Sequence, residues 1–176
     1  MDDDMYVMPH WDLQLQDFTQ HFNKDTTFIC STMIERQGGT HSRRGHFGDH
    51  PDTFDEAALL KSETNHTYQG YAHSISTHQP ALISRVLWEK VKGYSPEFAP
   101  AIGTDDDLAF KCWAAGCSDQ VGVANSLVYH FQSTSTRRID LVAGRENRDT
   151  IFKEKYGMTI PEFHKKIGRG EQWKYA

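Results

Sequence analysis

Apolar positions recur along the chain with two different spacings. Between residues 10 and 23 the large apolar side chains stand three or four positions apart with polar residues between them, which predicts a helix packed through one face. Residues 26–34 are apolar and rich in β-branched side chains, which predicts a buried strand. Both kinds of element are therefore expected near the start of the chain.

Helical and strand patterns continue to alternate through the remainder of the chain. Because they interleave, we expect one α/β domain over residues 1–176, with a mixed sheet flanked by helices. Gly93 and Gly116 are expected to end two helices, and Pro161 to lie near the start of the last one. The expected helices are 53–63, 105–116 and a C-terminal pair within 142–176, the expected strands are 71–77 and 121–130, and 81–94 reads as a strand end that leads into a helix.

Between residues 35 and 52 the apolar signal disappears and Gly, His and Arg dominate. This predicts a mobile surface loop, longer than a simple connection usually is. Its histidines and an aspartate resemble a set of metal ligands, so a metal hydrolase is one interpretation, beside a loop that contacts an acceptor and a solvated loop. The pattern has neither the HExxH nor the CxxC arrangement, which disfavours the hydrolase. The residues concerned are His41, His46, Asp49 and His50.

Composition narrows the classes of function. Aromatic residues make up 12% of the 176 residues, which argues against disorder, although the mean hydropathy of -0.66 is polar for a globular protein. The net charge of -5 and the lack of a long basic run make nucleic acid an unexpected partner. Three cysteines form no CxxC pair, no apolar stretch approaches about 20 residues, and the N-terminus lacks the basic and then apolar pattern expected of a signal peptide. We therefore expect a cytoplasmic protein, with peripheral attachment to a membrane left open.

Two acidic runs carry the candidate chemistry. Asp2, Asp3 and Asp4 directly precede an apolar segment; they are either solvated terminal residues or oxygen ligands that hold Mg²⁺ or Mn²⁺ against a substrate diphosphate. The second run, 104–107, opens the helix predicted after Gly103. Thr104 or Asp105 is expected to cap that helix, and the carboxylates to favour its positive end by roughly 0.3–1 kcal/mol each. A carboxylate at this helix start is also well placed to act as a general base on a hydroxyl.

A third group of polar residues follows the strand that ends at His130. Two serines and two arginines come directly after it, at positions 133, 135, 137 and 138. A histidine at a strand end is commonly structural, but beside hydroxyls and arginines it becomes a candidate contact for a metal ion or a phosphate.

Four landmarks in this order resemble the family-2 glycosyltransferases of the GT-A fold. The first is "DDDMYVMPHW", with acids, an apolar run and Pro-x-Trp before a helix. The second and third are "SRVLWEKVKGY", similar to the family's "R..FEKVGGF", and "TDDDLAFKCWAAG", similar to "ED.DL..R...AG". The fourth is the strand that ends in Tyr129 and His130, with "KYG" after it. The resemblance covers nearly the whole chain.

The resemblance implies an inverting, metal-dependent transfer of a sugar from a nucleotide-diphosphate sugar to an acceptor hydroxyl. Asp2, Asp4 and His130 would then lie at a Mn²⁺ or Mg²⁺ ion that bridges the diphosphate, with Asp3 toward the ribose or sugar. Asp105 aligns with the catalytic base, with Asp106 and then Asp107 as alternatives if the run is shifted by one residue or more. Arg137 and Arg138 would neutralise the leaving phosphate. A glycan, a lipid-linked molecule or a protein could be the acceptor, as in polysaccharide biosynthesis.

The chain departs from the family pattern at three points. Thr104 stands where the family has Glu, and Lys111 where it has Arg, which keeps the charge but loses the bidentate geometry. The strands that bind the nucleotide in this family have no counterpart before Asp2, so the expected fold is a partial GT-A domain that begins at the DxD motif. The alternative to an enzyme is a non-catalytic remnant or interaction module of the same fold.

Overall fold

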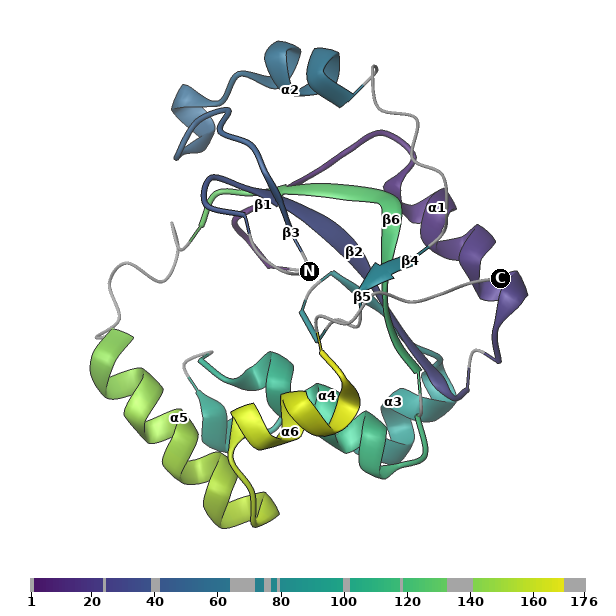
Figure 1. Cartoon of the computed structure of the whole chain (residues 1–176), viewed down its shortest axis with the longest axis vertical. Coiled ribbons are helices and arrows are strands. Elements are labelled where there is room, and N and C mark those ends of the chain that lie inside the picture. Colours follow the sequence, from purple (N-terminus) through teal and green to yellow (C-terminus); the bar gives the residue numbers. More distant parts are fainter. Residues whose placement is uncertain are drawn as a thin grey trace.

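The chain folds into one mixed β-sheet with helices on both faces (Figure 1), as the alternating patterns predicted. The computed structural model describes residues 2–23, 25–38, 42–63, 72–74, 77–78, 80–99, 102–117, 119–132 and 141–169. The strands in these ranges are β1 Met5–Val7, β2 Thr27–Glu35, β3 Ser42–Arg44, β4 Ala72–Ser74, β5 Ala81–Leu82 and β6 Asp119–His130. The helices are α1 Trp11–Phe18, α2 Glu56–Glu63, α3 Arg85–Val91, α4 Thr104–Ala114, α5 Leu141–Tyr156 and α6 Ile160–Ile167. Three short 3-10 turns are η1 Thr19–His21, η2 Pro51–Thr53 and η3 Pro96–Phe98.

Two long strands form the middle of the sheet. β2 and β6 run parallel and pair along most of their length. The C-terminal half of β6 also pairs with β1, and its N-terminal half pairs with β4, in both cases antiparallel. β3 pairs in parallel with the C-terminal end of β2, and β5 pairs antiparallel with the N-terminal half of β2. The sheet is therefore mixed: β6, β2 and the short β3 run parallel, and the strands at its edges are short.

A bulge interrupts β6 halfway. Ser31 pairs with Val123 and the next residue of β2, Thr32, pairs with Leu127, so residues 124–126 lie outside the ladder. Two hydrogen bonds hold the bulge: Thr32 Oγ1 donates to the Val123 carbonyl at 2.7 Å, and the Ser31 and Ser126 hydroxyls lie 2.7 Å apart. β6 bends sharply at this region (Figure 1).

Each face of the sheet is covered by different helices. α1 packs on one face through Leu15 and Phe18, against Val121 and Val123 of β6. α3 and α4 cover the other face over the first half of β2, and α2 covers the far end of the sheet. α5 and α6 do not touch the sheet core but pack on α4 through a cluster of aromatic side chains. These are Phe98, Phe110, Phe152 and Phe163.

Helix ends follow the sequence signals closely. Ser84 caps α3 by accepting the Leu87 N–H at 3.0 Å, and Gly93, just beyond its end, has φ +59°. Gly116 ends α4 with φ +100°, and Pro161 lies in the first turn of α6, where Thr159 and Glu162 form a capping box. No described helix combines the length and the apolar character that crossing a bilayer requires.

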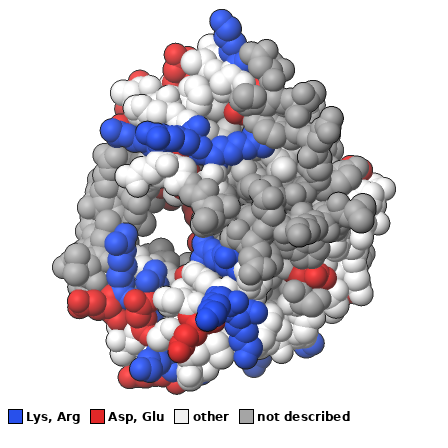
Figure 2. Space-filling model, viewed as in Figure 1, with Lys and Arg blue, Asp and Glu red and all other residues white. Residues whose placement is uncertain are grey.

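The segment 35–52 is more structured than a plain loop, and the sequence interpretation was wrong on this point. It contains β3 and begins η2. β3 needs no apolar side chains because it is an edge strand held by backbone pairing, and charged residues are typical there. Arg43 donates to the carboxylate of Glu63 at 3.1 Å, and Arg36 to that of Asp49 at 3.3 Å. Figure 2 shows Lys and Arg side chains in a row over this part of the molecule, whereas acidic and basic side chains alternate around α5.

Candidate functional site

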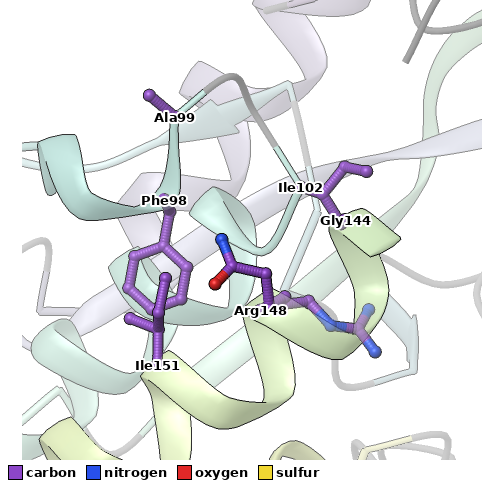
Figure 3. A pocket seen from close by; sticks show the side chains of 7 residues that line it. Phe98, Ala99, Ile102, Gly144, Arg148 and Ile151 are labelled. Carbon is purple, nitrogen blue, oxygen red and sulfur yellow. The ribbon is translucent and has the colours of Figure 1, made fainter. Parts of the chain in front are cut away.

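The helix start that carries three aspartates differs from its predicted cap. Gly103, and not Thr104 or Asp105, is the N-cap of α4. Gly103 has φ +97°, and a Cβ there would lie 2.4 Å from Cγ of Arg148. Arg148 closes a small cavity of about 30 Å³ between η3 and α5 (Figure 3). Glycine is therefore required both by the turn and by the close approach of α5.

Consecutive residues on a helix point about 100° apart, and the three aspartates consequently face three different surroundings. Asp107 points into the protein and is fully buried. Its carboxylate accepts from the Tyr156 hydroxyl and forms ion pairs of 3.1 Å with Lys111 and with Lys155. Burial opposes ionisation, but hydrogen bonds from Ser95, Tyr156 and Lys155 hold its pKa below the ordinary value. Asp107 is a structural counter-ion.

Asp106 faces α6. Its Oδ1 lies 2.6 Å from Nε2 of His164, 3.4 Å from the Arg169 guanidinium and 3.4 Å from the Thr77 hydroxyl. Burial raises the pKa of this carboxyl group, but the contacts with His164 and Arg169 lower it by more, so the net pKa is below the usual range. A carboxylate stabilised in this way binds a proton weakly, which disfavours it as a general base.

Asp105 is close enough to Tyr94 for its charge to act on that phenol. Tyr94 is 44% exposed. Burial raises the pKa of its phenol, and the negative charges of Asp105 and Asp2 raise it further. The two acidic runs, a hundred residues apart in the sequence, therefore act on one tyrosine. Tyr94 also lines a cleft of about 430 Å³ between β5, α3 and α4.

One of the N-terminal acids, Asp4, pairs with a histidine. Asp2 and Asp3 are exposed and Asp4 is 8% exposed. His130, at the end of β6, lies with Nε2 3.4 Å from Asp4 Oδ1 and with Nδ1 2.7 Å from Glu35 Oε1. Burial lowers the pKa of His130, but its contacts with Asp4 and Glu35 outweigh this and raise it to about 9. In this arrangement His130 is a protonated counter-ion between two carboxylates.

Whether these residues suit a metal ion can be tested from their charges. Although Asp2 is exposed overall, partial desolvation of its carboxyl group raises its pKa, and the nearby Asp4 charge raises it further because the two carboxylates repel one another. Such a pair is the donor set that a hard divalent cation stabilises. Within the part of the chain that the structure describes, no group of three or more His, Cys, Asp and Glu side chains is arranged as a metal site. Asp2 and Asp4 fit such an ion by chemistry, and His130 would have to lose its proton to join them.

The remaining predicted residues divide into two groups. Arg137 and Arg138 lie outside the described residues, as does His41. In the segment considered for a metal hydrolase, His46 lies 3.3 Å from Asp49, whereas His50 turns to Asp52 at 3.1 Å. The two described histidines of this segment therefore pair with different aspartates.

The sequence interpretation missed several residues that shape the site. Glu35 could have been found, because it ends the strand beside the one that His130 ends. Tyr94 stood among the landmark residues without a role, and His164 belongs to a helix whose position on α4 the sequence does not reveal. Comparisons of the chain with protein-family models, with curated proteins and with solved structures give no match.

Proposed function

We propose that the chain is part of a glycosyltransferase that moves a sugar from a nucleotide-diphosphate sugar to an acceptor hydroxyl with inversion. One observation carries the proposal: Asp2 and Asp105, from two separate acidic runs, both lie within electrostatic reach of Tyr94 at the edge of an open cleft. A transfer of this kind needs a charged site for the diphosphate and a base for the acceptor close to each other.

Asp105 is the residue we assign as the base. Of the three carboxylates at the start of α4, Asp107 is fully buried and Asp106 is held by His164 and Arg169. Asp105 is partly exposed, and its charge acts on Tyr94, which lines the cleft. It would take the proton from the acceptor hydroxyl as the oxygen attacks the anomeric carbon.

The N-terminal acids would serve the leaving group. Asp2 and Asp4 would hold Mn²⁺ or Mg²⁺, and Asp3 would lie toward the ribose or sugar. A bound divalent ion supplies positive charge to the departing nucleoside diphosphate. Arg137 and Arg138, which follow His130 in the sequence, would add further positive charge.

The test uses the purified protein. Transfer and hydrolysis of UDP-, GDP- and dTDP-sugars are measured with Mn²⁺ for the wild type and for Asp105→Asn, Asp106→Asn and Asp52→Asn. We expect Asp105→Asn to lose at least about 100-fold in rate, as for removal of a general base, and Asp106→Asn to lose much less. Asp52, whose side chain is 88% exposed in a different part of the molecule, provides the matched control.

Two results would contradict the proposal. The first is that none of these sugars is bound or consumed with Mn²⁺ present. The second is a turnover that Asp105→Asn leaves unchanged. A protein that unfolds cooperatively but binds no nucleotide would instead favour a non-catalytic module, a role that the internal pairing of Asp106 with His164 and Arg169 also permits.

A further inference from the structure

Two of the three cysteines lie at the C-terminal end of α4. The helix ends in a Schellman turn: Gly116 has φ +100°, its N–H donates to the Trp113 carbonyl at 3.0 Å, and the Cys117 N–H donates to the Cys112 carbonyl at 2.9 Å. In a turn of this kind the side chains at the positions of Cys112 and Cys117 commonly pack against each other. Two thiols in this arrangement can do what two apolar side chains cannot, which is to form a covalent bond.

The backbone brings the two cysteines within disulfide range. Because the Cys117 nitrogen is 2.9 Å from the Cys112 oxygen, standard bond lengths place the two Cα atoms less than about 6.8 Å apart, and disulfides span Cα separations of about 4.4–6.8 Å. Both side chains are fully buried in one apolar cluster, and both thiols are free in this structure. To join its partner, Cys117 Sγ would give up only a weak bond, in which it donates to the Asp119 carbonyl at 3.4 Å.

The third cysteine belongs to the same apolar cluster but to a different part of the fold. Cys30 is fully buried on β2, where its neighbours in the sheet are Ala81 of β5 and Gly122 of β6. Among the residues that the structure describes, no three His, Cys, Asp or Glu side chains converge as a metal site, so the three thiols do not form a set of ligands for a soft metal ion. The arrangement of Cys112 and Cys117 suits a disulfide, and Cys30 serves as an internal control.

The turn that covers the two thiols is open on its outer face. Ala114 and Gly116 are exposed, and a Cβ atom at Gly116 would meet no atom of the described residues within 4 Å apart from its chain neighbours. The last turn of a helix opens more readily than its middle. Its opening would admit a small oxidant to Cys112 and Cys117, while Cys30 stays covered within the sheet.

We infer that Cys112 and Cys117 are a site of oxidative modification, at which a peroxide converts the two thiols into an intramolecular disulfide that locks the end of α4. One thiolate attacks the peroxide and becomes a sulfenic acid, and the other peroxide oxygen leaves as water or an alcohol. The second thiolate then attacks the sulfenic sulfur and displaces hydroxide, which takes a proton to form water. The two electrons that the thiols lose reduce the O–O bond of the peroxide. This site is at the opposite end of α4 from the three aspartates, and it does not depend on the proposed sugar transfer.

Oxidation of the native protein tests the inference. The protein is incubated with excess hydrogen peroxide at mildly alkaline pH and treated with catalase. It is then denatured with iodoacetamide present to block the remaining thiols, and digested with trypsin. Cleavage after Lys111 and Arg137 leaves Cys112 and Cys117 on one peptide, 112–137, whereas Cys30 lies on the peptide 25–36. We expect mass spectrometry to show that, over hours, the peptide 112–137 loses two hydrogen atoms and escapes alkylation, while the peptide 25–36 is alkylated in full.

Four variants make the result specific. Cys30→Ser should form the disulfide at the rate of the wild type, and Cys117→Ser should form none. Gly116→Ala places a side chain at φ +100°, which favours opening of the turn and should accelerate the reaction about fivefold or more. Gly157→Ala is the matched control, because Gly157 follows α5 with φ +69° and its Cβ position is equally open, so the same kind of strain arises away from the thiols.

Disulfide formation in the wild type and in Cys30→Ser, accelerated by Gly116→Ala alone, supports the inference. It is overturned if both thiols of the peptide 112–137 are still alkylated after a day in peroxide, or if they are oxidised to sulfinic acids without a disulfide. A disulfide that joins Cys30 to either of the other two also overturns it. So does a rate no higher in Gly116→Ala than in Gly157→Ala, because oxidation would then not proceed through the turn at the end of α4.

Discussion

Replacement of His130 by glutamine should change how the stability of the protein depends on pH. The His130 side chain is 19% exposed and lies between Asp4 at 3.4 Å and Glu35 at 2.7 Å. These contacts raise its pKa from 6.5 to about 9 against the opposing effect of burial. Glutamine keeps much of the shape of the side chain but cannot carry the proton.

The size of the effect follows from linkage between protonation and folding. A group whose pKa is raised in the folded state stabilises the fold fully below its unfolded pKa, here 6.5, and this stabilisation is lost as the pH rises through about 9. At about 1.36 kcal/mol per pKa unit, the loss is on the order of 3 kcal/mol. Glu35, whose pKa is lowered mainly by the hydrogen bond to His130 against burial, acts in the opposite direction: its contribution is lost on acidification, below 4.5.

The assay is urea unfolding followed by circular dichroism at a series of values between about pH 6 and about pH 10. We expect the free energy of unfolding of the wild type to fall by about 3 kcal/mol more than that of His130→Gln over this range. His50→Gln is the control, because His50 is about half exposed and pairs only with the exposed Asp52. Parallel curves for wild type and His130→Gln would refute the reasoning, as would an NMR titration of the His130 ring with a midpoint near 6.5.

Three further predictions concern the interior. Asp107→Asn removes the charge that Lys111 and Lys155 share, and should lower the free energy of unfolding by about 3 kcal/mol in urea; a loss below about 1 kcal/mol would contradict the buried ion pairs. Phe152→Ala empties the fully buried centre of the cluster between α4 and α6 and should cost about 3–5 kcal/mol in the same measurement, so a near-neutral result would show that the cluster is misplaced. Burial raises the pKa of Cys112 and Cys117 to about 12, so both thiols should resist a disulfide reagent at neutral pH until denaturant is added, and rapid modification of the native protein would contradict this.

Local signals were enough to predict most helices. α6 has a Thr–Glu capping box and Pro161 at its start, and α4 stops at Gly116, because these residues act on the backbone within a few positions of themselves. β3 escaped prediction because its pairing to β2 uses only main-chain groups and leaves no apolar pattern in Ser42–Arg44. The cap of α4 was misjudged because the approach of Arg148 to Gly103 depends on a helix more than forty residues later.

The apolar alternation along β6 is regular, although a bulge interrupts the strand. Val121, Val123, Leu127 and Tyr129 fall on odd positions, as on one face of an unbroken strand. The bulge at 124–126 inverts that face: the two valines pack against α1, whereas Leu127 and Tyr129 pack with α2. Contacts with α1 stabilise the bulge; for example, the Ser126 hydroxyl donates to the Trp11 carbonyl at 2.8 Å. No local sequence pattern predicts this change of face.

The candidate site, too, was predictable from the sequence only in part. The chemistry of its acids follows from residue type, and the sequence therefore predicted carboxylates at two places. Which of the three carboxylates of α4 remains accessible depends on Lys155 and His164, which reach α4 from α5 and α6. Tertiary contacts thus decide which of three adjacent aspartates is accessible, and these contacts cannot be predicted from a single sequence.

The bulge in β6 has a consequence for the local unfolding of the protein. Residues 119–123 pair with β2 and β4 and pack against α1. Residues 127–130 also lie beside β2, but they pair with β1 and pack against α2. One strand thus belongs to two regions that share little beyond β2, and such regions tend to exchange their amide hydrogens as separate cooperative units. Hydrogen exchange along β6 should then show two plateaus of protection with a step at 124–126, and the end of the strand that carries His130 should be the first to exchange.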